Sequence, residues 1–320
     1  MLHTLKRYWR LYRVLIAQFF KVVLQSKVDF LMGLLGFFLT QATGIIFLYL
    51  IFQQIPTLQG WTLDQLIFIY GFAQIPRGID HLLTDNIWLV AWRTVINGEF
   101  DRYMLRPMNV FFQVIAEKLQ PDALGELLIG TILVVISTIK GVATFSPLNV
   151  VLFIVSVLAG ALIYTSIKLF FAALAFWLKQ SGPFLQVAYE MAEFAKYPTE
   201  IYHRAIQFII TWVIPFAFVA YFPASFFLGK GDAWVVGAEV IIAVVFWCIA
   251  YGTFNYGLKG YESAGNELGN CILDIKIGLS LVLYSICDNP FLKASIIVQG
   301  LSHLREFHRK LRYRRLSQSL

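Results

Sequence analysis

Long apolar stretches, separated by charged segments, constrain the fold of this chain more than any other feature of its sequence. A transmembrane helix needs about 20 mostly apolar residues to cross about 30 Å of hydrocarbon. Residues 29–52, 122–139, 150–178 and 234–258 satisfy this requirement, with 122–139 close to its lower limit. The chain is therefore predicted to be an all-α integral membrane protein.

The composition supports this prediction. Of the 320 residues, 58% are hydrophobic and 14% are charged, whereas soluble domains average about 25% charged residues. A soluble fold cannot bury so much apolar surface, because much of any folded protein remains exposed. The three cysteines match no metal-binding or redox spacing, so we expect them to be packing residues and expect no metal site.

A fifth apolar stretch, residues 206–228, contains Pro215 and Pro223. Proline lacks a backbone donor and kinks or ends a helix. We therefore expect the exoplasmic end of this span to be broken or re-entrant, which is tolerated only where protein or water surrounds the backbone.

A sixth helix is predicted over residues 64–92, but only its first part is uniformly apolar. Polar residues then recur along one stripe of the helix: Gln74, Arg77, Asp80, His81 and Asp85. Ionisable groups are costly in lipid, so the stripe is expected to face other helices, a cavity or the cytosol. It either lines a translocation path or gate, or contains an Arg77–Asp80 pair that is satisfied within the bundle. Glu126 and Lys168 raise the same question, and Lys168 has the alternative of snorkelling to an interface.

The distribution of basic residues predicts the orientation. Alternate loops carry nearly all Lys and Arg residues, and the loops on the other side carry only Lys140 and Lys230. Because basic residues stay in the cytoplasm, six spans with both termini inside are expected. The net charge of +7 then requires no nucleic-acid partner.

Both ends of the chain are amphipathic. Residues 2–23 place apolar side chains on one helical face and Arg10 and Arg13 elsewhere, which is typical of a helix lying in the membrane interface. Residues 267–320 form a basic, amphipathic tail that is expected to lie on the cytoplasmic surface. Residues 1–266 are then a single transmembrane domain.

The loop between the second and third spans has a distinctive sequence, NGEFDRYMLRP at 97–107. Gly98 interrupts the long helix, and Pro107 ends a short new one because the residue before proline disfavours helical angles. A short charged helix is therefore expected at the cytoplasmic face, where it would pass the movement of a docked partner to both spans. The alternative is a solvated turn without a partner.

These features resemble the ABC-2-type exporter permeases, and in particular the branch with a GEFDRYLLRP-like loop. The resemblance covers residues 1–266. It is carried by the following stretches: RGIDHLLTDNIW (77–88), GEFDRYMLRPMN (98–109), AEFAKYPTEIY (192–202), VIPFAFVAYFPA (213–224) and GLKGYESAGN (257–266).

The resemblance implies that residues 98–107 are a coupling helix that docks a separate ATP-binding subunit. Glu99 and Asp101 would pair with basic groups of that subunit, and Phe100 and Tyr103 would be its aromatic anchors. The docking residues implied in this way are Gly98, Glu99, Phe100, Asp101, Arg102, Tyr103, Arg106 and Pro107.

The resemblance further implies a dimer with a second permease copy or a paralogue, in the plasma membrane of a bacterium. ATP and Mg would bind the partner subunit and no cofactor this chain, which is not expected to be an enzyme. The sequence agrees in lacking a G-x-x-x-x-G-K-[ST] phosphate loop and any catalytic motif. The implied function is outward transport of an amphipathic drug, peptide or lipid.

Two other functions fit a membrane protein of this kind. An ion-gradient-driven secondary transporter is expected to carry paired intramembrane carboxylates or broken helices at the midplane. A non-transporting membrane scaffold explains the topology but not the polar stripe.

Overall fold

The computed structural model describes residues 17, 21, 27–143 and 145–261. These residues belong to the first of two compact units, Met1–Glu262; the second unit is Ser263–Leu320. The predicted interfacial helix at 2–23 and the basic tail at 267–320 lie outside the described residues. The described part is helical and forms no strand beyond an isolated bridge between Leu58 and Trp61.

In the described part of the chain, five long helices form the bundle: four lie at the predicted apolar stretches, and α3 (Leu63–Thr84) lies at the predicted partly polar helix. The four are α2 (Lys27–Gln54), α7 (Ala123–Ile139), α8 (Pro147–Ala173) and α13 (Trp234–Lys259). Local capping explains where α8 begins. The Ser146 side chain accepts a hydrogen bond from the Asn149 backbone N–H at 3.2 Å, and Pro147 occupies the first turn, where its missing N–H costs nothing.

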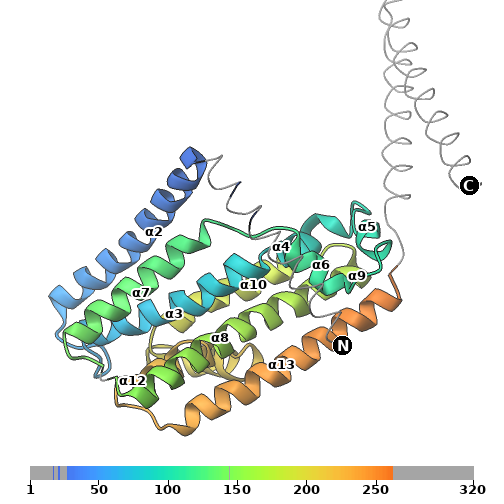
Figure 1. The fold of residues 1–320 in the computed structure, drawn as a ribbon. Coiled ribbons are helices and arrows are strands. Elements are labelled where there is room, and N and C mark those ends of the chain that lie inside the picture. The colour runs from blue at the N-terminus through green and yellow to red at the C-terminus, as the bar shows by residue number, and fades with distance from the viewer. Residues whose placement is uncertain (1–16, 18–20, 22–26, 144, 262–320) are drawn as a thin grey trace, which may run out of the picture. The chain divides into compact units, whose positions relative to one another are not determined.

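The helices lie side by side in one stack (Figure 1). α3 packs most extensively against α7 and α8 packs against α13, while α2 lies at the edge and contacts mainly α7. The short helices α5 (Asp101–Met104), α6 (Val110–Ala116) and α9 (Ala175–Leu178) gather at one end, which we call the α5 end. The opposite end carries α12 (Tyr221–Phe227) and is called the α12 end.

Aromatic side chains fill the core at both ends. At the α12 end, Phe72 packs edge-on against Phe153 with 5.3 Å between ring centroids, and Phe227 contacts both. At the α5 end, the ring centroids of Phe100 and Phe176 lie 5.0 Å apart. Edge-to-face pairs of this kind contribute beyond their buried area.

The outer helices expose their apolar side chains. Leu31, Phe38 and Phe47 on α2 are between 56% and 59% exposed, and Ile241 on α13 is 65% exposed. An apolar surface of this extent is unstable in water but natural in hydrocarbon.

Among the described residues, three helices are long and apolar enough to cross a membrane: Phe30–Gln54, Pro147–Leu178 and Trp234–Lys259. A fourth candidate is the bent pair Arg204–Val213 and Phe216–Phe227, whose helices meet at 75°. α7 has only 17 residues, and α3 carries the charged stripe, so length and composition alone do not identify these two as spans.

The fifth predicted span is broken where expected, but at only one of its two prolines. The bend falls at Ile214 and Pro215. Pro223 instead lies in the first turn of α12, where no N–H is required.

Residues 179–205, between the predicted fourth and fifth spans, fold against the bundle. α10 (Gly182–Ala192) packs against α8, and the 3₁₀ turn η2 (Glu193–Lys196) contacts α3. Lys196 is 5% exposed, with its ammonium 5.4 Å from the centre of the Tyr70 ring. The segment enters the bundle despite its polar residues because α3 supplies partners for them.

Candidate functional site

The polar stripe on α3 is the first of two candidate sites. Its buried centre is Asp80, which is 2% exposed. The Asp80 carboxylate receives hydrogen bonds from the hydroxyl groups of Thr84, Thr165 and Tyr189 at 2.5, 2.8 and 2.9 Å. The Lys168 ammonium lies 2.8 Å from the same carboxylate. Asp80 is thus fully satisfied, as a buried charge requires.

Two sequence interpretations of these charges are wrong. Arg77 does not pair with Asp80: it pairs with Glu193 on η2, and its Nε lies 3.9 Å from Glu126 on α7. Lys168 does not snorkel, because it is 1% exposed and Asp80 neutralises it inside the bundle. The partners of Arg77 lie on α7 and η2, and the partner of Lys168 lies on α3. The spacing of residues along α3 does not reveal these contacts between elements.

Two buried polar groups, Gln74 in the stripe and Glu126 beside it on α7, remain incompletely bonded. Gln74 is fully buried and donates to the Gln41 side chain at 3.1 Å, but its own Oε1 has no partner among the described residues. Glu126 contacts His81 Nδ1 at 3.3 Å through one oxygen, while its Oε2 has no partner in the part of the chain that the structure describes. Such groups are rare in folded proteins.

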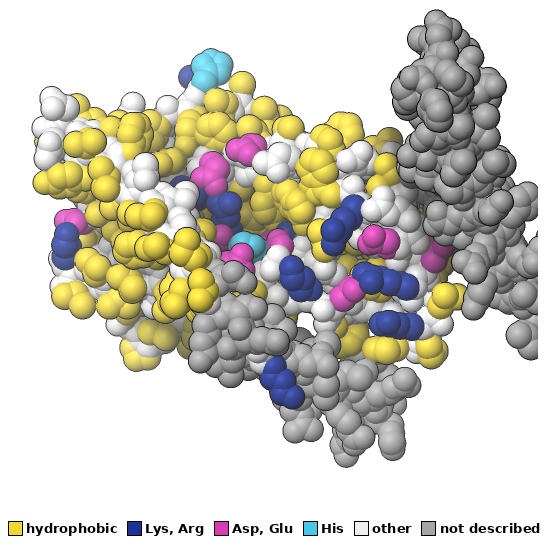
Figure 2. All heavy atoms as spheres, turned by 90° about the horizontal axis from the view of Figure 1, so that it is seen from above, with side chains coloured by type: hydrophobic (Ala, Val, Ile, Leu, Met, Phe, Trp, Pro, Cys, Tyr) yellow, Lys and Arg dark blue, Asp and Glu magenta, His cyan; other side chains and the backbone are white. Residues whose placement is uncertain are grey.

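The remaining stripe residues are partly open. The side chains of Arg77, His81 and Asp85 are 25%, 31% and 24% exposed, and Glu193 is 46% exposed. Asp85 also accepts a hydrogen bond from Gln120 at 3.2 Å. Charged side chains gather in a band on one face of the protein, bordered by hydrophobic side chains (Figure 2). No group of His, Cys, Asp and Glu that could hold a metal is found among the residues described.

The second candidate site is the segment 98–107. Gly98 has a φ of 69°, which a residue with a side chain rarely adopts. The chain therefore turns there, and α5 follows as a helix of only 4 residues, Asp101–Met104. The short helix is present as predicted.

Phe100 and Tyr103 are not anchors for a partner, which corrects the sequence prediction. They are 0% and 3% exposed. Phe100 packs against Phe176 and, at 5.2 Å, against Tyr261. The Phe100 and Tyr103 side chains attach the four-residue helix to the bundle.

The exposed surface of the segment is made by other residues. Leu105 is 85% exposed and Met104 is 46% exposed. They stand beside three charged residues, Glu99, Arg102 and Arg106, and Pro107, which are exposed as well. Asp101 is partly buried and accepts a hydrogen bond from the Tyr261 hydroxyl at 3.0 Å. The sequence analysis missed Met104 and Leu105, although two consecutive apolar residues in a charged loop were a visible signal.

A family model described as ABC-2 family transporter protein matches residues 38–265. This chain belongs to the ABC-2 family. Neither a curated protein nor a solved structure matches it. As an ABC-2 family protein with apolar spans, the chain is an integral membrane protein and a membrane permease component of an ABC transporter.

The ABC-2 protein holds its α5 segment firmly in place. Glu117 accepts a hydrogen bond from the Tyr103 hydroxyl and forms an ion pair with Arg102 at 2.6 Å. The Gln113 side chain donates to the Tyr103 and Met108 carbonyl groups, both at 3.0 Å. The segment is therefore a rigid projection rather than a loose loop.

Proposed function

We propose that this chain is the permease subunit of an ATP-driven exporter. Two permeases, identical or paralogous, would span a bacterial plasma membrane with six helices each and dock separate ATP-binding subunits at the α5 end. The observation that carries the proposal is the segment 98–107, which presents the exposed Leu105 on a rigid base. Exposed apolar residues within a charged rim are typical of protein contact sites.

The contacts of this segment support a coupling role. The Phe100 backbone N–H donates to the Thr94 carbonyl at 3.0 Å, and Thr94 ends η1 (Val90–Thr94), a π-helix that continues the line of α3 through α4 (Asn86–Leu89). The Phe100 ring is at the same time packed on α9, which continues α8. A push on Leu105 would thus reach both α3 and α8.

The open half of the polar stripe would line the translocation path. Arg77, His81 and Glu193 are partly exposed on a bundle whose outer surface is apolar. Charges at such positions require water or a partner rather than lipid. A path that combines a charged band with apolar borders suits an amphipathic substrate, whether a drug, a peptide or a lipid.

The test is recovery of the partner from native membranes with a tagged full-length chain. We expect an ATP-binding subunit with the unaltered chain and its loss with Glu99→Lys/Leu105→Asp, because both side chains are exposed and neither supports the core. Asp232→Lys, an exposed charge reversal between α12 and α13, is the matched control and should retain the partner. Repeated recovery of no ATPase with a monodisperse chain would exclude the exporter.

A secondary transporter is the other candidate, and one observation favours it. Glu126 and Glu239 are 2% and 0% exposed, and each has a carboxyl oxygen without a partner among the described residues. Buried carboxyl groups of this kind carry protons in gradient-driven transporters. Transport that stops on dissipation of the proton gradient and persists without ATP would favour this candidate.

A further inference from the structure

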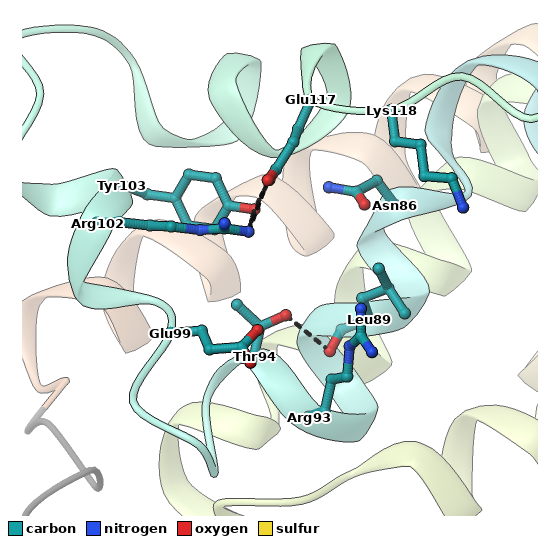
Figure 3. Close-up of a pocket in the computed structure, with 9 residues that line it drawn as sticks. All are labelled: Asn86, Leu89, Arg93, Thr94, Glu99, Arg102, Tyr103, Glu117 and Lys118. Carbon is teal, nitrogen blue, oxygen red and sulfur yellow. Dashed lines mark hydrogen bonds and ion pairs between the residues drawn. The ribbon is translucent and has the colours of Figure 1, made fainter. Parts of the chain in front are cut away.

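A polar pocket adjoins the docking segment at the α5 end. It has a volume of about 300 Å³, at the lower limit for small-molecule sites. Its walls come from α4 and η1, from the segment 98–107, and from the residues after α6 (Figure 3). We propose that this pocket binds a phosphate group between Arg93 and Lys118.

The charges of the pocket are unbalanced. Its lining contains three cations, Arg93, Arg102 and Lys118, and two carboxylates, Glu99 and Glu117. Arg102 is neutralised by Glu117 at 2.6 Å. Arg93 and Lys118 form no ion pair and no side-chain hydrogen bond with any residue in the described part of the chain, and only Glu99 remains to offset them.

The neutral groups of the lining are already engaged. The Asn86 amide donates to the Val114 carbonyl at 2.7 Å, and the Thr94 hydroxyl donates to the Leu89 carbonyl at 3.0 Å. The Tyr103 hydroxyl donates to Glu117. The pocket therefore keeps two charged groups, the Arg93 guanidinium and the Lys118 ammonium, that have no partner among the described residues; Figure 3 shows both among the side chains that line it.

A phosphate group matches this arrangement better than a carboxylate. A guanidinium offers paired donors to two phosphate oxygens, and an ammonium contacts a third as a point charge. Either an anionic lipid headgroup or free phosphate carries this chemistry. Basic pockets near the ends of transmembrane helices on the cytoplasmic side are suited to anionic headgroups. Only the assignment to the cytoplasmic leaflet rests on the proposed function; binding does not.

The pocket would connect its ligand to docking. Arg102 and Tyr103 form one wall of the pocket, and Leu105 follows two residues later. A bound ligand would therefore contact η1, the docking segment and the chain after α6 at the same time.

The experiment is native mass spectrometry of the full-length chain in detergent. The mass of the protein shows how many lipid molecules it retains. Phosphatidylglycerol is compared with diacylglycerol of the same acyl chains, which lacks the phosphate. The test variant is Arg93→Gln/Lys118→Gln, and the control is Lys259→Gln, an exposed charge in the last turn of α13. A second arm measures thermal unfolding with inorganic phosphate. All side chains changed are exposed, so the variants should fold.

We expect retention of phosphatidylglycerol but not of diacylglycerol, with affinity at least about tenfold lower in the double variant and unchanged in Lys259→Gln. Stabilisation by inorganic phosphate that the double variant loses would also support the site, with soluble phosphate as the source. Equal behaviour of the double variant and the unaltered chain in both arms would overturn the proposal, as would equal losses in Lys259→Gln. Neither arm involves an ATPase, so the result is independent of the partner-recovery test.

Discussion

At the scale of single residues, the pairing of Lys168 with Asp80 is the most consequential contact in the bundle. Both side chains are almost fully buried, on α8 and α3, and three hydroxyl groups complete the bonding of Asp80. Removing two charges from water is costly, so a pair of this kind adds little net stability. Removing one partner is different, because an uncompensated charge is left inside.

We predict that Lys168→Met lowers the free energy of unfolding by about 3–5 kcal/mol. The double variant Lys168→Met/Asp80→Asn should recover much of this loss, because no lone charge remains. Denaturant unfolding in detergent measures both values. Lys140→Met is the control: its pair with Asp64 is about half exposed and should contribute at most about 1 kcal/mol. Equal losses for Lys168→Met and Lys140→Met would contradict the prediction.

At the scale of elements, two glycines bring α3 and α7 into close contact. A Cβ placed on Gly130 would lie 2.8 Å from the Gly71 carbonyl oxygen, and one on Gly71 would lie 2.7 Å from the Leu133 Cβ. Small residues allow helix backbones to approach in this way inside membranes.

The prediction is that Gly130→Ala destabilises the protein by about 1–3 kcal/mol through overpacking. Gly237→Ala on α13 is the control, since a Cβ there meets nothing within 4 Å and removing a helical glycine should stabilise by up to about 1 kcal/mol. Thermal unfolding of the purified variants gives the comparison. If Gly130→Ala proved as stable as Gly237→Ala, the close approach of the two helices would be refuted.

The docking segment combines a core residue with a contact residue, and the two should respond differently. Phe100→Ala is expected to cost about 3–5 kcal/mol of stability, because the ring is fully buried. Leu105→Ala should change stability by no more than about 0.5 kcal/mol and yet reduce recovery of the ATP-binding subunit. Unfolding and pull-down measured on the same preparations separate the effects. A destabilised Leu105→Ala chain would place this residue in the core instead.

At the scale of the whole molecule, the proposed topology predicts which end of the bundle faces the cytoplasm. Single cysteines are placed at Asp232, between α12 and α13, and at Arg106, in the docking segment, after the native cysteines are replaced by serine; both positions are exposed. A membrane-impermeant maleimide should label Asp232→Cys in intact cells and Arg106→Cys only in opened membranes. The reverse pattern would invert the orientation.

Several features of this protein followed from its sequence because their causes are local. Apolar length predicted the helices α2, α7, α8 and α13, and the missing N–H of Pro215 marked the break. Gly98 and Pro107 similarly marked the short docking helix, whose glycine adopts a φ of 69°. Each of these outcomes depends on a few neighbouring residues and on the hydrocarbon around them.

Tertiary structure alone decided which groups meet. Spacing along α3 offered an Arg77–Asp80 pair as one interpretation. In the structure, Arg77 contacts Glu126 on α7 and Glu193 on η2, and Asp80 pairs with Lys168 on α8. The family resemblance implied that Phe100 contacts a partner, but Phe176 on α9 and Tyr261 bury it. A buried charge takes whichever partner the packing of distant elements brings within about 3 Å, because in a low-dielectric interior that contact outweighs proximity along the chain.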